Sequence, residues 1–423
     1  MNGAEREAQK IYNRAMPRTV HEWRERIRRF AADECRTSSR LYEVVSLGMA
    51  DDPELLEWIA STINPRVDAT SILAAVHDRL LAGVADGGLA AFYPNLTERP
   101  SPPDGAYPAF RAFVLAHRDE LAALLAERTT QTNEVRRCSY LLPALVFAAA
   151  RTVRPLALID AGASAGLNLL FDRYGYDYGD GAVTGDLTSP VQIATQSRGA
   201  RPPLALIDVG ASAGLNLLFD RYGYDYGDGW VCGDAASSVR IATQARGARP
   251  PLVPWPTIAG RIGIDLTPVA LGDAAATRWL EACVWPEHVD RFALLRAALA
   301  VARAARPRVI AGNAIEVLPP LIESTDADAA IVVVNTNVIQ YFSPDERAAY
   351  GRVLRDAGGR RELFWIANEH RALLRQAGFA RPIERASESS ALPLAISHWH
   401  DGVCDELVAA EVGPHGRWLN WYD

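Results

Sequence analysis

The sequence has few of the residues that build disulfide frameworks or metal sites. Its five cysteines are scattered, odd in number and form no CxxC pair: Cys35, Cys138, Cys232, Cys283 and Cys404. This pattern argues against a disulfide framework and against a zinc site. Lysine is almost absent as well. Lys10 is the only lysine, so nearly all of the positive charge comes from arginine.

Long apolar runs and an excess of positive charge are also missing. No apolar run reaches the length of a membrane span, and the N-terminal sequence is too polar for a signal peptide. The net charge is −7, with acids and bases mixed along the chain, which argues against a nucleic-acid partner. We therefore expect a cytoplasmic protein that binds a small-molecule substrate and has neither a nucleic-acid nor a membrane partner. The oligomeric state stays unknown.

The chain contains one stretch twice. Residues 155–202 and 203–250 are tandem copies with a period of 48, and they differ at eight positions. Seven of these differences lie in the second part of the copy, so the first part differs only at Ala161/Val209. Two copies are too few for a solenoid, and we interpret them as a tandem duplication inside an ordinary domain. One copy is expected to fill the core and the other to be an insert.

Each copy begins with a short apolar run, an acid and a turn of small residues. In the second copy these are 204–207, Asp208 and Gly210-Ala-Ser-Ala-Gly214. The run is short and bounded by Pro and Gly, which predicts a buried strand, and the apolar residues at 215–219 predict one face of a helix. A strand, a tight turn and a helix together direct free backbone N–H groups at a ligand.

The rest of the chain divides by its periodicity into a helical part and an α/β part. Residues 1–153 predict a helical cap, with helices expected at 21–32, 41–49, from 52 onward, 71–84, 109–128 and 134–153. Residues 154–423 alternate strands with helices, which is typical of a mostly parallel sheet. Strands are expected at 261–265, 308–313, 329–334 and 362–367, helices at 279–304, 315–322 and 344–356, and a closing antiparallel pair at 392–399 and 417–422.

Several ligand motifs can be tested against the turn. A dinucleotide fingerprint would need Gly where Ser212 and Leu215 stand, and the Gly-Lys-Ser/Thr of a P-loop is absent. Gly210-Ala-Ser212-Ala-Gly214 matches a nucleophile elbow literally, with three histidines available downstream, His398, His400 and His415. The helical sequence upstream and the nearby acid do not suit an elbow, so a hydrolase is kept as an alternative.

A further motif rests on a resemblance. Asp208-Val-Gly210-Ala-Ser212-Ala-Gly214 resembles the first motif of class I S-adenosylmethionine-dependent methyltransferases, with Ser212 in place of the middle Gly. Over about the last 220 residues the resemblance implies a Rossmann-like fold, S-adenosylmethionine as cofactor and methyl transfer to a small molecule. It implies that Asp265 binds the ribose hydroxyls, that Asn313 faces the adenine amine and that 335–337 lies near the methyl group. The Asn/Asp-Pro-Pro-Tyr signature of amino methyltransferases is absent.

At a finer level the chain resembles an uncharacterised bacterial family, domain of unknown function 2332, over roughly residues 20–423. The resemblance rests on Gln131-Thr-Asn-Glu134, the turn with its following Leu-Asn and Asp-Arg-Tyr, Gly-Ile-Asp265, 279–286 (WLEACVWP) and His415-Gly-Arg-Trp418. It implies a single copy of the glycine-turn unit, so the second copy is a departure. Because the family has no assigned reaction, this resemblance indicates a fold and not a function.

The candidate site residues fall into three groups. The cofactor-binding candidates are Asp208, Gly210, Ser212, Gly214 and Asn216 in copy two, their counterparts Asp160, Gly162, Ser164, Gly166 and Asn168 in copy one, and Asp265 and Asn313. Copy two is favoured because it keeps the crossover to the next strand short. The polar segment 128–137 is either a capped helix start or a polar lip over the ligand, and it supplies the substrate-binding candidates Asn133, Glu134 and Arg137. The catalytic candidates are Glu369 as general base, Asn335 and Tyr341.

His398 and His400 share one strand face, but a third ligand at metal-binding spacing is lacking, so no metal site is predicted. The sequence thus predicts a helical cap at 1–153 followed at 154–423 by a class I methyltransferase-like α/β domain with an internal duplication. Two alternatives to a methyltransferase stay open. One is a methyltransferase-like nucleoside-binding protein without turnover, and the other is an α/β hydrolase that uses the serine of the Gly-x-Ser-x-Gly motif, Ser212 or Ser164.

Overall fold

The computed structural model describes residues 19–63, 67–131, 133–152, 156–160, 176–177, 182–183, 204–253, 258–326, 329–384, 388 and 390–422. The chain divides into two compact units. The helical unit takes in 1–132 and 273–296, and the sheet unit takes in 133–272 and 297–423. These bounds differ from the boundary at 153 expected from the sequence, because 133–153 belongs with the sheet and 273–296 with the N-terminal helices.

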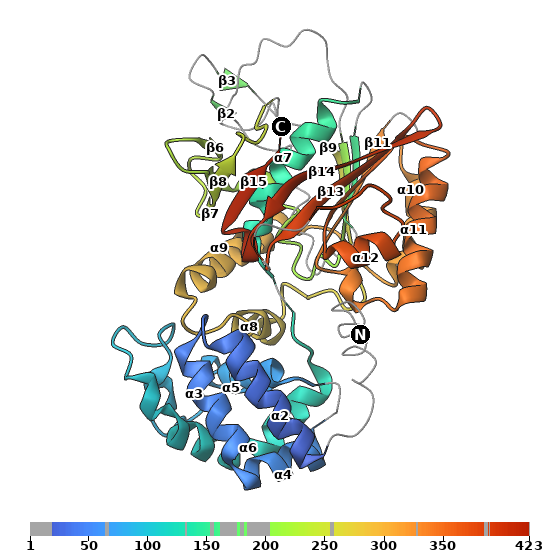
Figure 1. Cartoon of the computed structure of the whole chain (residues 1–423). Helices are drawn as coiled ribbons and strands as arrows, with labels where there is room; N and C mark the ends of the chain where they lie inside the picture. The colour runs from blue at the N-terminus through green and yellow to red at the C-terminus, as the bar shows by residue number, and fades with distance from the viewer. Residues whose placement is uncertain are drawn as a thin grey trace. The chain divides into compact units, whose positions relative to one another are not determined.

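The helical unit is built from helices with well-formed N-caps. Thr19 forms a capping box with Glu22, and Ser39, Asp52 and Asp68 each accept a backbone N–H at the start of their helices. The elements are α2 Val20–Phe30, the π-helix η2 Ala31–Cys35, α3 Arg40–Asp51, α4 Pro53–Thr62, α5 Ala69–Leu81, η3 Leu89–Phe92, η4 Pro103–Gly105, α6 Ala106–Glu127 and α8 Ala274–Ala282. Figure 1 shows the N-terminal helices in blue. The N-terminal region is therefore helical, as predicted.

Helix α8 joins this unit through its side chains. Trp279 is 2% exposed within the apolar core formed by α2 to α6, and its indole N–H donates to the carbonyl of Thr129 at 2.8 Å. The expected single helix at 279–304 is wrong, because the chain forms α8 and then α9 Val289–Ala305. Pro286 lies between them, and proline lacks the N–H that a continuous helix would need. The division between the two units falls within α9.

The sheet unit contains a ten-stranded mixed sheet among the described residues. Its order is β10-β9-β1-β11-β12-β13-β14-β15-β8, and β4 also pairs with β9. The strands are β1 Leu156–Asp160, β4 Leu204–Val209, β8 Gln244–Gly247, β9 Ile258–Asp265, β10 Val309–Ala311, β11 Ala330–Thr336, β12 Leu363–Asn368, β13 Leu392–His400, β14 Val403–Val412 and β15 Trp418–Trp421. From β10 to β12 all pairs are parallel, whereas β13, β14 and β15 pair antiparallel. The prediction of an α/β protein with a mostly parallel sheet is confirmed.

The closing antiparallel pair is wrong in detail. Strand β13 does not pair with β15, because β14 lies between them and pairs with both. The first half of β14 is largely exposed and carries Asp405 and Glu406 side by side, and the strand is fully buried only from Ala409 to Val412. A strand of this kind has no continuous apolar alternation, which explains why its sequence does not predict it.

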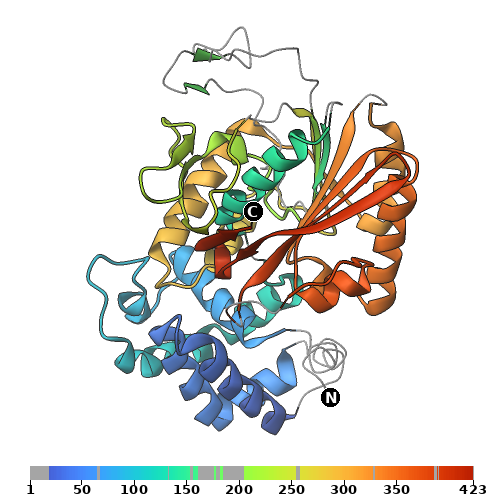
Figure 2. The same ribbon diagram turned by 45° about the horizontal axis from the view of Figure 1, so that its top comes forward.

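The remaining elements of the sheet unit cover the sheet or connect its strands. They are η5 Val135–Arg137, α7 Cys138–Ala149, η7 Phe219–Arg221, α10 Ala314–Ser324, η8 Ile339–Tyr341, α11 Pro344–Gly358, α12 Arg371–Gln376, η9 Pro414–Gly416 and the short strands β2 Tyr176–Asp177, β3 Ala182–Val183, β5 Gly223–Asp225, β6 Val231–Gly233 and β7 Arg240–Ala242. Figures 1 and 2 show α10 and α11 on one face of the sheet and α7 on the other. Side chains of α10, α11 and α12 form one core with those of β4, β9, β11 and β12.

The helix expected after the glycine turn is absent. Residues 212–218 form turns and one bridge, followed by the short 3₁₀ helix η7. The backbone bonds here reach three residues back, as from Leu217 N to Gly214 O at 3.0 Å, where an α-helix would reach four. Leu215, Leu217, Leu218 and Phe219 are all buried. A helix would place only one side of this run in the core, so burial on all sides explains why the prediction is wrong.

The two copies of the repeat meet at one place in the sheet. Strand β1 of copy one pairs parallel with β9 and β11, with Leu156 opposite Ile258. Strand β4 of copy two also pairs parallel with β9, and Leu204 is opposite the same Ile258. Both copies therefore supply a strand for the position beside β9.

Candidate functional site

The site is built at the carboxyl ends of the parallel strands. The position beside β9 is taken by a strand of the repeat, β1 or β4, which we call the repeat strand. The next strands of the parallel part of the sheet, β9 and β10, lie on one side of it, and the following ones, β11 and β12, lie on its other side. The order thus reverses next to the repeat strand, and ligands of open α/β sheets bind at such a point. Asp208, Asp265, Thr336 and Glu369 lie at or next to the carboxyl ends of these strands.

The small-residue turn follows β4 in a left-handed backbone conformation. Gly210 has φ 82°, Ser212 has φ 44° and Gly214 has φ 63°. Glycine adopts such values freely, but Ser212 carries a side chain, and positive φ is uncommon for residues other than Gly. The turn is therefore held by contacts from other elements rather than by its own preference.

Asp265 supplies one of these contacts. Its Oδ2 accepts a hydrogen bond from the backbone N of Ser212 at 3.2 Å, and its Oδ1 accepts one from Thr267 N at 2.8 Å. The two elements are also joined by Gly210 N, which donates to Ile264 O at 2.9 Å. The expected proximity of the turn and the acid after β9 is thus present in the structure.

Asn133 supplies the second contact, from the polar segment before α7. Its Nδ2 donates to Ser212 Oγ at 2.6 Å, and its Oδ1 accepts from Ala213 N at 2.9 Å. One amide side chain therefore covers two successive residues of the turn. The interpretation of 128–137 as a polar lip over a ligand stays a prediction, and Asn133 here binds protein atoms.

Arg137 brings a positive charge to the same edge. Its Nη1 donates to both the carbonyl and the Oγ1 of Thr336, each at 3.2 Å. Its guanidinium also acts electrostatically on Asp208 and Glu369, lowering the pKa of both carboxyls against the larger effect of their burial. Thr336 lies within 335–337, the stretch expected near the methyl group, but it was not singled out as a site residue.

The three carboxyl groups are strongly perturbed. Burial raises the pKa of Asp208 well above its ordinary value, and Asp265 raises it further. Burial likewise raises the pKa of Asp265 to about 6, although the bond from Thr267 N opposes the change. Burial raises the pKa of Glu369 to about 7. Acids perturbed in this way and gathered at one sheet edge are typical of functional sites.

Glu369 and Asn335 form a buried network at the ends of β11 and β12. Oε1 of Glu369 accepts from Asn335 Nδ2 at 2.9 Å, Val338 N at 2.6 Å and Ile339 N at 3.2 Å. Asn335 is 0% exposed. Its Oδ1 accepts from Trp365 Nε1 at 2.6 Å and from the Tyr350 hydroxyl at 3.2 Å. The network fixes the loop after β11, and the catalytic roles of Glu369 and Asn335 stay predictions.

Other predicted residues have local partners. Asn313 caps α10 by accepting from Ile315 N at 3.0 Å. Asn216 is buried, and its carbonyl lies 3.7 Å from the thiol of Cys138. Tyr341 is 62% exposed. Their roles in binding or catalysis stay predictions.

Glu134 joins the polar segment to the C-terminal strands. Its Oε1 accepts from Arg136 N at 3.1 Å, and its Oε2 lies 3.6 Å from Nδ1 of His415. Of the copy-one candidates, Asp160 ends β1, where it pairs with Val334 and Gly263. The other copy-one candidates lie outside the described residues: Gly162, Ser164, Gly166 and Asn168.

His398 does not belong to this site. Its Nε2 lies 2.9 Å from Oε1 of Glu362, which precedes β12, so the pair is at the amino end of that strand. The neighbouring His400 binds Asp405 at 2.9 Å. His398 therefore lies far from Ser212, the serine it was considered to serve in a hydrolase, because β13 runs antiparallel to β12 and carries its last residues to the opposite edge. In the described part of the chain, no group of three His, Cys, Asp or Glu is arranged to hold a metal ion.

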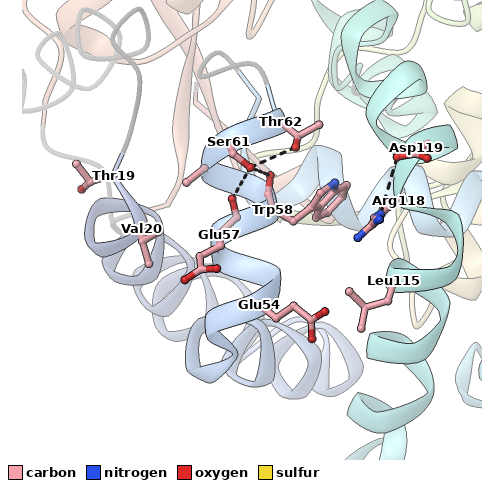
Figure 3. A pocket seen from close by; sticks show the side chains of 11 residues that line it. Thr19, Val20, Glu54, Glu57, Trp58, Ser61, Thr62, Leu115, Arg118 and Asp119 are labelled. Carbon is pink, nitrogen blue, oxygen red and sulfur yellow. Dashed lines mark hydrogen bonds and ion pairs between the residues drawn. The ribbon is translucent and has the colours of Figure 1, made fainter.

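A separate pocket lies within the helical unit, between α4 and α6 (Figure 3). Its volume is about 810 Å³, and Trp58, Glu57 and Arg118 are among the side chains around it. Glu54 on its wall is already paired with Arg111. None of the predicted site residues lines this pocket, so we place the candidate site at the sheet edge, where the perturbed acids are.

A family model described as "Uncharacterized protein conserved in bacteria (DUF2332)" matches residues 24–204 and again 197–421. The chain belongs to this family. The first DUF2332 match ends within two residues of the end of copy one, and the second covers copy two and the rest of the chain. No curated protein and no solved structure matches the chain.

Three of the sequence motifs that carry the DUF2332 resemblance converge on the turn or its lip. Asn133 and Asp265, from two of these motifs, both contact the turn of the repeat. His415, from another, contacts Glu134 next to Asn133. Within the described ranges no helix is both long and apolar enough to cross a membrane.

Proposed function

We propose that this DUF2332 protein binds S-adenosylmethionine at the carboxyl edge of its sheet and transfers the methyl group to a small molecule. The observation that carries the proposal is the 3.2 Å hydrogen bond between Ser212 N and Asp265 Oδ2. It joins a turn with left-handed backbone to a carboxylate on the neighbouring strand. A nucleoside with an amino-acid tail can use both elements. The backbone N–H groups of the turn can bind its carboxylate, and the side-chain carboxylate can accept hydrogen bonds from both ribose hydroxyls.

The charge of the site favours a cationic ligand. Asp208, Asp265 and Glu369 all have a raised pKa because burial disfavours their ionised forms. A positive charge placed nearby would stabilise the ionised carboxylates and lower each pKa again. The sulfonium of S-adenosylmethionine carries such a charge, whereas the product S-adenosylhomocysteine has a neutral sulfur.

The amides of the turn already have protein acceptors, which the ligand would have to replace. Ala213 N is bound by the side-chain oxygen of Asn133 at 2.9 Å, and Ser212 N by Asp265. The carboxylate of the ligand would take the place of the Asn133 oxygen. Asn133 would then contact the ligand from above, as expected of a polar lip.

Methyl transfer requires mainly that the enzyme hold the acceptor and the methyl group in the correct relative position. The acceptor's lone pair attacks the methyl carbon in line with the C–S bond, whose electrons pass to sulfur and leave neutral S-adenosylhomocysteine. The acceptor then loses its proton to a base. Glu369, with a pKa of about 7, suits this role near neutral pH.

The binding test compares S-adenosylmethionine titrations of the wild type, Asp265→Asn and Asp356→Asn by calorimetry. Asp265→Asn keeps the shape of the side chain but removes its charge, so we expect the Kd to rise by about tenfold or more, the size of one charge-assisted hydrogen bond. Asp356 is exposed on α11 and serves as the matched control, with no change expected. Failure of the wild type to bind S-adenosylmethionine at millimolar concentration would reject the proposal.

The turnover test follows release of S-adenosylhomocysteine by mass spectrometry during incubation with a small-molecule extract. We expect release with the wild type and slower release with Glu369→Gln when S-adenosylmethionine is present at a concentration that saturates each protein. Binding without release in any extract fraction would favour the alternative of a nucleoside-binding protein without turnover.

One observation keeps the hydrolase as a second candidate. Ser212 has φ 44°, and a nucleophile elbow also holds its serine on a strained turn. Against it, Ser212 Oγ accepts from Asn133, and no α-helix follows the turn. Labelling of Ser212 by a fluorophosphonate, lost in Ser212→Ala, would favour the hydrolase over the transferase.

A further inference from the structure

Two strands of the chain share one interval of the sheet. Strand β1 lies between β9 and β11, with Leu156 opposite Ile258 on one side and Ala330 on the other. Strand β4 also contacts both β9 and β11, and its Leu204 is opposite the same Ile258. Neighbouring strands of a sheet are about 4.8 Å apart, so the interval between two flanking strands has room for one backbone.

We propose that the two copies are alternative occupants of this interval and exchange in the folded protein. In one state β4 fills it and copy one is the insert. In the other state β1 fills it and copy two is the insert. The proposal rests on strand pairing alone, and it holds whichever ligand the site binds.

Copy one repeats the side chains that copy two uses to hold itself in place. In copy two the hydroxyl of Tyr222 donates to Leu215 O at 2.7 Å, and that of Tyr226 donates to Ser139 O at 2.8 Å. Ser212 accepts from Asn133 and Asp220 pairs with Arg261. The residues 48 positions earlier are identical, namely Tyr174, Tyr178, Ser164 and Asp172. Partners outside the repeat, such as Asn133, Ser139 and Arg261, are thus available to either copy.

The length of the insert does not favour either state. The segment left outside the interval is one repeat of 48 residues in both cases. The entropic cost of closing a loop depends on its length, so this cost is nearly the same for the two states and cancels from their ratio.

The copies differ in the strand and turn at a single position, and this difference favours copy two. Val209 is 3% exposed and belongs to the core shared with α10 and α11, whereas its counterpart in copy one is Ala161. Valine buries two more carbons than alanine, which favours the state with β4 by on the order of tenfold. Copy two is therefore the majority occupant and copy one a minority of roughly a tenth.

The test uses a buried ion pair that only the occupying copy can make. Arg261 Nη2 lies 3.1 Å from Asp220 Oδ2, and the two side chains are 5% and 0% exposed. Removing one partner of such a pair usually lowers a folding equilibrium constant by two to three orders of magnitude. Asp172 can replace Asp220 if copy one enters the interval.

Four full-length chains are compared by native-state hydrogen exchange of β11 and β12 in urea, which reports on the sheet unit: wild type, Asp172→Ala, Asp220→Ala and the double variant. Asp172→Ala is the matched control, with the same substitution in the minority copy, and should equal the wild type. Asp220→Ala should lose about tenfold in the folding equilibrium constant, because copy one takes over. The double variant should lose two to three orders of magnitude, far more than the two single variants together. An Asp220→Ala loss as large as that of the double variant would overturn the exchange.

Hydrogen exchange supplies a second readout. The peptides from 156–161 and 204–209 can be distinguished by mass because they end in Ala161 and Val209. In the wild type we expect slow exchange at 204–209, and in Asp220→Ala the protection should move to 156–160. Protection that stays at 204–209 in a folded Asp220→Ala protein would also overturn the exchange.

Discussion

The buried carboxyl of Glu369 should make the sheet unit less stable as pH rises. Its pKa is raised from 4.5 to about 7, chiefly by burial, so the folded state holds the proton more tightly than the unfolded state. Below pH 4.5 the group is protonated in both states and costs nothing. Between pH 4.5 and 7 the folded state still binds the proton, whereas the unfolded state releases it. Rising pH therefore favours the unfolded state, and the free energy of unfolding falls. Each pKa unit is worth about 1.4 kcal/mol, so the total is roughly 3 kcal/mol.

Glu369→Gln isolates this contribution. The amide oxygen can still accept from Asn335, Val338 and Ile339, but the side chain no longer ionises. We expect the difference in unfolding free energy between the variant and the wild type to shift by roughly 3 kcal/mol in favour of the variant from pH 4.5 to pH 8. Any constant cost of the new N–H₂ group appears at both pH values and cancels.

The assay is native-state hydrogen exchange of β11 and β12 in urea, so that the result refers to the sheet unit. A chain with two units need not unfold in one step, which makes a global transition hard to interpret. Glu323→Gln is the matched control, because Glu323 is exposed on α10 in the same unit and its Oε1 lies 3.9 Å from Nη2 of the exposed Arg360. Parallel pH curves for the wild type and Glu369→Gln would refute the reasoning.

Three further outcomes follow from particular contacts. Arg347→Met should destabilise the sheet unit by about 3 kcal/mol, because this 1% exposed guanidinium donates to Ile339 O at 2.7 Å and to two further oxygens that would lose their donor. Native-state hydrogen exchange of β11 and β12 would check this against the exposed Arg352→Met. Burial lowers the pKa of His77 to about 4, so the helical unit should lose up to roughly 3 kcal/mol as pH falls from 6.5 to 4. Native-state hydrogen exchange of α5 in urea should find this loss in the wild type and not in His77→Gln. If the proposed ligand is right, the affinity for S-adenosylmethionine relative to S-adenosylhomocysteine should rise as pH increases from 5 to 8, because Asp265 ionises near pH 6, and calorimetry showing a constant ratio would contradict it.

The site shows how far local sequence reasoning reaches. Asp265 and the glycine turn were expected to meet because each follows a strand of one parallel sheet, and the 3.2 Å bond at Ser212 agrees with this. Asn133 was expected only as part of a lip. Its bond to Ser212 joins residues 79 positions apart, and no periodicity encodes a contact of that kind.

The amino-acid sequence by itself determined the strands of the parallel part of the sheet and the helical N-terminal region, because apolar periodicity and capping side chains act over a few residues. Tertiary structure alone decided that 215–219 is not a helix, that 273–296 packs with the N-terminal helices and that His398 lies at the opposite edge from Asp265. Each of these depends on which surfaces are buried by residues distant in the chain. The two strands that share Ile258 are the extreme case, because their nearly identical sequences carry the same local information and only the space between β9 and β11 distinguishes occupant from insert.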